Sequence, residues 1–197
     1  MATEERMIAV LRAGEPVLLP TDTVYGLAGN AADPAHVQRV YELKGRVEAQ
    51  PSALLTADVD ALLDCLPELR GGYEKAIRAL LPGPYTLVLP NPARRYPWLT
   101  GGTPEAIGVR VPDLSKEARQ ALGDTCVAAT SANDPGGPDP VRLEDVPARI
   151  RAAVAAELDV GPLPGIPSTV LDLTGPQPRV IREGAVAAAE AIAALPT

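Results

Sequence analysis

P-T-D-T-V-Y-G-L, residues 20–27, directly follows an apolar triplet at 17–19 that predicts a buried strand. Pro20 has no backbone donor for a sheet, so we expect the strand to end there. Hydroxyl and carboxylate side chains crowd the next positions. Gly26 allows the backbone to turn sharply or to approach a ligand closely. The stretch therefore predicts a polar loop at the end of a strand, which is a common place for a binding site.

A short helix that ends in two cations is expected next, within E-L-K-G-R at residues 42–46. Asp33 suits an N-cap, Pro34 suits the first turn, and Gly45 suits the helix end. Lys44 then lies in the last turn and Arg46 lies just beyond it. Such cations often only complement the partial negative charge of a helix C-terminus. Beside a hydroxyl-rich loop, they are also candidates for binding an anion.

The remaining chain alternates between strand and helix patterns, which indicates an α/β fold. Trp98 lies in a proline-rich loop, where we expect a hydrophobic anchor, with stacking on a ligand as the alternative. No repeat or linker marks a second domain, so residues 1–197 are expected to form one domain. Strands are expected at 53–55, 85–89, 106–111, 126–130, 168–173 and 179–181, and helices at 3–14, 58–66, 73–81, 115–122, 146–158 and 185–195.

Composition and charge disfavour several kinds of binding site and cellular location. The net charge of −7 does not favour nucleic-acid binding by the whole surface, although a local basic groove could still exist. Cys65 and Cys126 lack C-x-x-C spacing and favour two reduced thiols over a disulfide or metal site. His36 has polar neighbours and is expected at the surface. The acidic start does not resemble a signal peptide, and no apolar run reaches membrane length, so a cytoplasmic location is expected.

The two stretches at 20–27 and 42–46 resemble the YrdC family (also called TsaC), the bacterial threonylcarbamoyl-adenylate synthases. Later segments extend the resemblance in order along nearly the whole chain. The resemblance implies a single YrdC-like domain, 1–197, with an open, twisted, mixed sheet flanked by helices around a concave ligand groove. The later segments are P-G-P-Y-T-L-V-L at 82–89, G-V-R-V-P-D at 108–113, A-T-S-A-N at 129–133, and S-T-V-L-D-L with I-R-E-G within 168–184.

The resemblance also implies a reaction and a set of site residues. The reaction joins L-threonine, bicarbonate and ATP into threonylcarbamoyl-AMP and pyrophosphate, for N6-threonylcarbamoyladenosine in tRNA. It makes tRNA threonylcarbamoyl-transfer proteins the downstream partners. Mg²⁺ would come with ATP, held mainly by phosphate oxygens, because the sequence shows no metal-ligand cluster. Lys44 and Arg46 would be catalytic, with Lys44 offsetting charge near the carbamate and α-phosphate. Tyr25 would line the pocket. Threonine would be held by Thr23, Arg110 and Ser168, and ATP by Arg46, Ser131, Asn133 and Arg182.

Physical reasoning supports this site. Arg110, Ser131, Ser168 and Arg182 fall at or near predicted strand ends, where open α/β sheets bind ligands. Arginine suits phosphate and carboxylate because its guanidinium offers a planar, bidentate fork.

Departures from the family pattern keep other functions open. Where the family commonly has K-G-R-P-x-x-K-P-L, this chain has K-G-R-V-E-A-Q-P-S, so that Gln50 replaces the second lysine. This encourages the alternative of a YciO-like paralogue with weak or different activity. An RNA-binding or ribosome-maturation module is another alternative, which the acidic charge weakens, although weak RNA binding stays open. A carbamoyl-transfer domain of the hydrogenase-maturation type is a further one.

Overall fold

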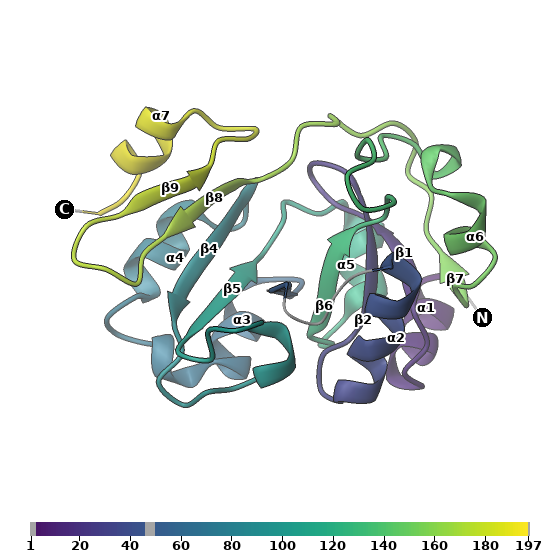
Figure 1. Ribbon diagram of the computed structural model, residues 1–197, viewed down its shortest axis with the longest axis horizontal. Coiled ribbons are helices and arrows are strands. Elements are labelled where there is room, and N and C mark those ends of the chain that lie inside the picture. Colours follow the sequence, from purple (N-terminus) through teal and green to yellow (C-terminus); the bar gives the residue numbers. More distant parts are fainter. Residues whose placement is uncertain (1–2, 46–49, 197) are drawn as a thin grey trace.

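The computed structural model describes residues 3–45 and 50–196. Within them, nine strands form one mixed sheet in the order β7-β1-β2-β6-β3-β5-β4-β8-β9, with helices around it (Figure 1). The expected α/β class with an open, mixed sheet is therefore confirmed. The strands are β1 (Val17–Pro20), β2 (Tyr25–Asn30), β3 (Ala53–Leu55), β4 (Tyr85–Pro90), β5 (Ala106–Arg110), β6 (Val127–Ser131), β7 (Ala156–Glu157), β8 (Thr169–Asp172) and β9 (Arg179–Arg182).

The helices pack buried apolar faces against the sheet in three clusters of core residues. The predicted caps explain where several helices begin and end. Asp33 caps the start of α2, and Gly45 ends it in the left-handed conformation at φ 66°. Asp58 caps the start of α3, and Ser115 caps the start of α5. The helices are α1 (Thr3–Arg12), α2 (Pro34–Lys44), α3 (Val59–Cys65), α4 (Glu74–Leu80), α5 (Lys116–Leu122), α6 (Ala148–Arg151) and α7 (Ala188–Ala193).

The predicted helix at 146–158 is wrong. Only Ala148–Arg151 is helical, and Ala156–Glu157 forms strand β7, which pairs in parallel with β1. The alanine-rich composition favours a helix, but pairing with the open edge of β1 satisfies the backbone there instead. The closing helix is likewise shorter than the expected 185–195.

Strand β2 was not predicted, because Gly26 favoured a turn or a ligand contact. It lies between β1 and β6, with Gly26 opposite both Leu19 and Ser131. The polar turn is limited to residues 21–24. The Thr21 hydroxyl holds that turn, since it donates to Val24 O at 2.7 Å and accepts from the backbone N–H of Thr23 and Val24.

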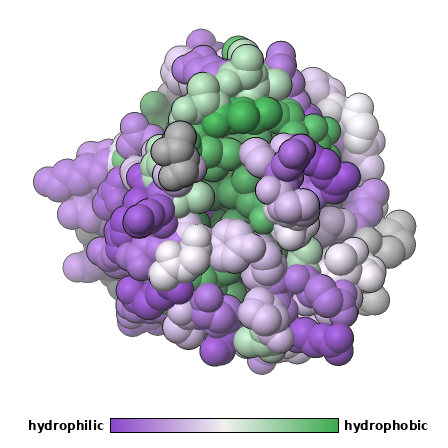
Figure 2. All heavy atoms as spheres, turned by 90° about the vertical axis from the view of Figure 1, so that its left-hand side faces the viewer, coloured by the Kyte–Doolittle hydropathy of each residue, from purple (hydrophilic) through white to green (hydrophobic). Residues whose placement is uncertain are grey.

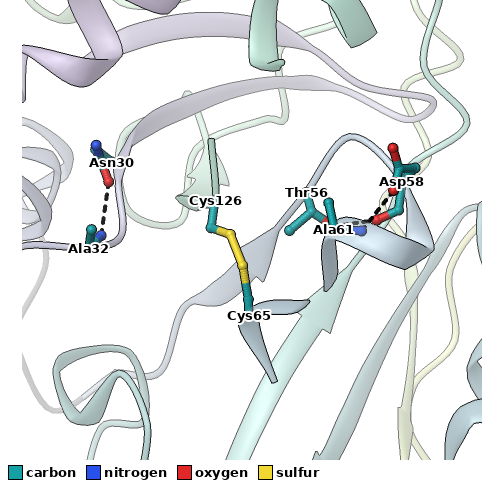
Figure 3. The surroundings of a disulfide bond; sticks show 7 residues. All are labelled: Asn30, Ala32, Thr56, Asp58, Ala61, Cys65 and Cys126. Atoms are coloured by element: carbon teal, nitrogen blue, oxygen red, sulfur yellow. Dashed lines mark hydrogen bonds between the residues drawn. A yellow bond between two sulfur atoms is a disulfide. The ribbon is translucent and has the colours of Figure 1, made fainter. Parts of the chain in front are cut away.

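Cys65 and Cys126 form a disulfide, which joins the end of α3 to the residue before β6 (Figure 3). The prediction of two reduced thiols is therefore wrong. The cysteines are 61 residues apart in the chain, and only packing of both against one core cluster brings them together. Spacing in sequence carries no sign of such a long-range pair.

His36 was expected at the surface, and the structure places it there only in part, because the residue is half-buried. Its ring lies over Gly14, where an added Cβ would come within 2.1 Å of His36 Nε2. Trp98 is the hydrophobic anchor that we expected. Its indole N–H donates to Ala31 O at 3.0 Å, and its ring packs against the main core.

The side of the molecule around β9 and α7 carries exposed apolar residues. Figure 2 looks at the left-hand side of Figure 1 and shows hydrophobic residues gathered in the upper half, among hydrophilic ones. Ile181 of β9 is 59% exposed and Ile192 of α7 is 41% exposed. Strand β9 is the last strand of the sheet, so no further strand among residues 3–45 and 50–196 pairs with its outer edge.

Candidate active site

A cavity of about 600 Å³ lies across the middle of the sheet. Its walls come from β2, β3, β4, β5, β6, β8 and β9 and from the turn at 21–24. Hydroxyl side chains are frequent in these walls, and arginines lie at the ends of β5 and β9. Five of the predicted site residues line this one cavity, namely Thr23, Arg110, Ser131, Ser168 and Arg182.

Arg110 ends β5, and its side chain is only 12% exposed. Its Nη2 donates to Asp22 Oδ1 and to Thr23 Oγ1, each at 2.6 Å. Its Nε is buried, and no group in the described part of the chain accepts a hydrogen bond from it. Burial lowers the pKa of the Arg110 guanidinium, Asp22 opposes this, and the charge of Arg182 lowers the pKa further. The cavity thus has a buried cation with donors to spare, which suits an incoming anion.

Arg182 and Ser168 form a second polar cluster in the wall of the cavity. The Arg182 guanidinium donates to Ser168 O from Nη2 at 2.8 Å and from Nε at 3.2 Å. The Ser168 hydroxyl lies 2.8 Å from Thr86 Oγ1 and 3.2 Å from Arg182 Nη2. Gly184 lets the backbone pack tightly here, because an added Cβ would lie 2.1 Å from Pro167 O. This close approach gives a physical reason for the glycine of I-R-E-G.

Lys44 joins the end of α2 to the segment after β6. Its side chain is buried, and its Nζ donates to Ser131 O and Asn133 O, each at 2.7 Å, and to Asn133 Oδ1. The Ser131 hydroxyl donates to the same Asn133 Oδ1 at 2.7 Å. The structure therefore brings Lys44, Ser131 and Asn133 together. Of these three, Ser131 lines the cavity, and the other two fix its position.

Arg46 lies outside the described residues. Gln50 is described and exposed. The role of Arg46 in binding ATP, and the effect of Gln50 in place of the family's lysine, therefore stay predictions.

Tyr25 does not line the cavity, although the sequence led us to expect this. The residue is fully buried in the core beside α2, and its hydroxyl lies 2.9 Å from Asp159 Oδ1 and 2.8 Å from Gly161 O. Burial raises the pKa of the Tyr25 hydroxyl. Neighbouring residues of a strand point to opposite faces, and it is Gly26 that faces the cavity. Tyr25 instead fixes the segment at 159–161 against β2.

The sequence analysis missed several polar residues of the site. Asp22 binds Arg110, although it lies 88 residues away in the chain, and Thr86 binds Ser168 across 82 residues. Asp139 and Thr130 also line the cavity. Asp22 stood within the first quoted stretch, but its partner could be found only from the fold.

Residues 3–45 and 50–196 hold no group of three or more His, Cys, Asp or Glu side chains placed to bind a metal ion. In the same residues, no helix combines the length and apolarity needed to cross a bilayer.

The Sua5/YciO/YrdC family model, described as "Telomere recombination", matches residues 9–184. The chain belongs to this family. A threonylcarbamoyl-AMP synthase of Bacillus subtilis is 35% identical over 182 residues, which are 90% of this chain and 52% of that protein. A putative threonylcarbamoyl-AMP synthase of Mycobacterium tuberculosis is 33% identical over 91% of this chain and 82% of its own length. This Sua5/YciO/YrdC chain thus spans about half of the first relative and most of the second.

Solved structures of the family agree with the fold. Pyrococcus abyssi Sua5 complexed with L-threonine superposes with a TM-score of 0.85 at 31% identity, over 99% of this chain and 59% of that chain. Escherichia coli YciO gives a TM-score of 0.79 over 96% of this chain and 92% of that chain. At 24% identity, YciO supports the Sua5/YciO/YrdC fold alone.

Proposed function

We propose that this chain is a nucleotidyltransferase that makes threonylcarbamoyl-AMP from L-threonine, bicarbonate and ATP. The observation that carries the proposal is the convergence of Arg110, Ser168 and Arg182 with Ser131 on one cavity. Relatives at 33% and 35% identity bear the name threonylcarbamoyl-AMP synthase. We further propose that residues 1–197 act as one YrdC-like domain, since one sheet runs through the described residues.

The threonine half of the site would lie between β5 and β8. The carboxylate of the amino acid would bind the Arg110 guanidinium, which lines the cavity. Charge-assisted hydrogen bonds of this kind are about twice as strong as neutral ones. Thr23 and Ser168 would complete this half, because both line the same cavity as Arg110. The related P. abyssi Sua5 has been solved with L-threonine, which supports this choice of amino acid.

The contacts to ATP would come from β6 and β9, on either side of the threonine half in the strand order. Ser131 and Arg182 line the cavity there, and Asn133 fixes the Ser131 hydroxyl. Lys44 brings a positive charge directly behind Ser131, and Arg46 follows Lys44 closely in the chain. Positioned cations and donors of this kind can each stabilise the charge that develops in a transition state by about 3 kcal/mol. Mg²⁺ would arrive with ATP and be held mainly by phosphate oxygens.

The reaction would proceed in two steps within this cavity. The ammonium group of threonine first gives one proton to solvent. The neutral amino nitrogen then bonds to the carbon of CO₂ and loses a second proton to the hydroxide that bicarbonate releases, which gives a carbamate and water. One carbamate oxygen then bonds to the α-phosphorus of ATP, while the bond from that phosphorus to the leaving pyrophosphate breaks. Every reactant is anionic or zwitterionic, so the protein's part is to hold them together against their repulsion. The product would then pass to the proteins that transfer threonylcarbamoyl to tRNA.

Incubation of the protein with ATP, bicarbonate and labelled threonine tests this function. We expect a labelled adenylate and pyrophosphate, and no labelled adenylate when bicarbonate is removed. Arg110→Ala should weaken threonine binding at least tenfold in calorimetry, because a nearby point charge does not replace a bidentate carboxylate partner. An exposed arginine far from the cavity, Arg12→Ala, is the matched control. Full activity of Arg110→Ala would refute the proposed site.

A YciO-like paralogue with weak or different activity is the second candidate, and the observation that favours it is Gln50. The residue is exposed and stands where the family commonly carries a lysine. If the protein binds threonine and ATP but forms no adenylate, this candidate replaces the first. RNA binding fits less well, because the net charge is −7.

A further inference from the structure

Asp22 places a carboxylate beside a cavity that we assign to anionic substrates. Its side chain is only 10% exposed, and both of its oxygens have partners. Oδ1 accepts from Arg110 Nη2 at 2.6 Å, and Oδ2 accepts from the backbone N–H of Asp113 at 3.1 Å. Asp22 is not among the residues that line the cavity, whereas Arg110 is. Asp22 can therefore act on a ligand only through another group.

That group is Arg110, because the contacts of Asp22 determine which donors of the guanidinium remain. Both protons of Nη2 are taken by Asp22 and Thr23, whose acceptor atoms each lie 2.6 Å away. Nη1 makes no hydrogen bond to any residue within 3–45 and 50–196, and Nε is buried without a partner. The guanidinium is thus held at Nη2, and Nη1 is the nitrogen that stays available at the cavity, since Arg110 lines it. A carboxylate ligand needs this kind of fixed, partly unfilled fork.

Asp22 also adds a link between two segments that the Arg110–Thr23 contact already joins. It belongs to the turn between β1 and β2, and Asp113 follows β5, so its carboxylate ties that turn to the end of β5. Arg182 lies near enough to disfavour the charge on Arg110. Without Asp22, the buried Arg110 charge would lose its only carboxylate partner in the described part of the chain, and the side chain would turn toward solvent.

We propose that Asp22 is a positioning residue for threonine, which holds Arg110 at the cavity wall with its remaining donors available to the substrate carboxylate. This inference rests on the proposed function. Asp22 and the substrate carboxylate would bind different nitrogens of the same guanidinium, so they support one another and do not compete. Its removal should therefore affect the amino-acid half of the site and spare the ATP half. A merely structural role would weaken both halves together.

Calorimetry with threonine and ATP, measured separately, tests the inference. For Asp22→Asn we expect threonine affinity to fall at least tenfold and ATP affinity to stay within twofold. Asp22→Glu keeps the charge one methylene group further out, so threonine affinity should fall about threefold, with ATP again unchanged. Asp58→Asn is the control, since Asp58 caps α3 at the surface and its loss perturbs stability without touching Arg110.

The outcomes separate the inference from the function on which it rests. If wild-type protein binds no threonine, the proposed function fails and the inference fails with it. If wild type binds threonine and Asp22→Asn binds it equally well, the inference alone is wrong. Equal losses for threonine and ATP would show a structural role and would also overturn it. If Asp22→Asn does not fold, Asp22→Glu decides in the same way, because an unchanged threonine affinity there contradicts the inference.

Discussion

Replacing Lys44 by methionine tests whether this buried cation holds the site together. Methionine keeps the apolar stem and the approximate volume of the side chain but removes the ammonium group. The Lys44 Nζ donates to Ser131 O and Asn133 O at 2.7 Å, and its residue is 7% exposed. Both carbonyls would lose a charged donor, so the change acts on the backbone that follows β6.

The size of the effect follows from those bonds. Hydrogen bonds to charged groups contribute about 1.5–3 kcal/mol each. Part of this is offset, because the ammonium no longer has to be removed from water. We expect the free energy of unfolding to fall by about 2–4 kcal/mol. For a chain of this size, that corresponds to a fall in Tm of about 5–15 °C.

Thermal and urea denaturation measure this change directly. Lys75→Met is the matched control, because Lys75 is an exposed lysine on a helix, and its Tm should change by less than 2 °C, roughly. Lys44→Met should also weaken ATP binding, since Ser131 and Asn133 lose their common partner. A Tm equal to that of wild type would refute the buried-clamp role of Lys44.

Three further predictions concern other parts of the site. Gly184→Ala should lower both Tm and threonine affinity, because the added Cβ would push against Pro167 O. Gly175→Ala is the control and should change neither, because its Cβ would come no nearer than 3.8 Å to Gln177 O. Arg179 and Thr174 lower the pKa of Asp172 to about 2. The ionised carboxylate therefore adds up to about 2 kcal/mol to the free energy of unfolding, which is complete above pH 4, roughly, and is lost as the pH falls through 2. The free energies of unfolding of wild type and Asp172→Asn in urea should converge over that pH window, and a constant difference would contradict this. Gln50→Lys should tighten ATP binding by about 0.5–2 kcal/mol if the position faces the phosphates, and unchanged affinity in calorimetry would show that it does not.

Local signals in the sequence were enough for most of the elements. Asp33, Gly45 and Asp58 marked helix ends by their capping chemistry, and the structure confirms each of them. Patterns failed where long-range pairing decided the outcome. The segment Ala156–Glu157 became a strand because the edge of β1 lies beside it, and composition alone could not reveal that neighbour.

The same contrast between local sequence signals and long-range contacts holds for the site. The family resemblance named Thr23, Arg110 and Ser168, a polar loop and strand ends supported the choice, and all three line one cavity. Tyr25 was misplaced because a one-residue step along β2 changes the face of the sheet, and no signal in the sequence marked which residue faced the cavity. Asp22 and Arg110 are 88 residues apart in the chain, so their ion pair could be found only once the fold was known.

The central claim is that the cavity joins threonine to carbon from bicarbonate and then to AMP. The most direct measurement supplies ¹³C-bicarbonate with threonine and ATP and follows the products by mass spectrometry, together with released pyrophosphate. We predict threonylcarbamoyl-AMP that carries one ¹³C, formed in equal amount to pyrophosphate. An adenylate without the label, or release of ADP and phosphate in place of pyrophosphate, would contradict the account.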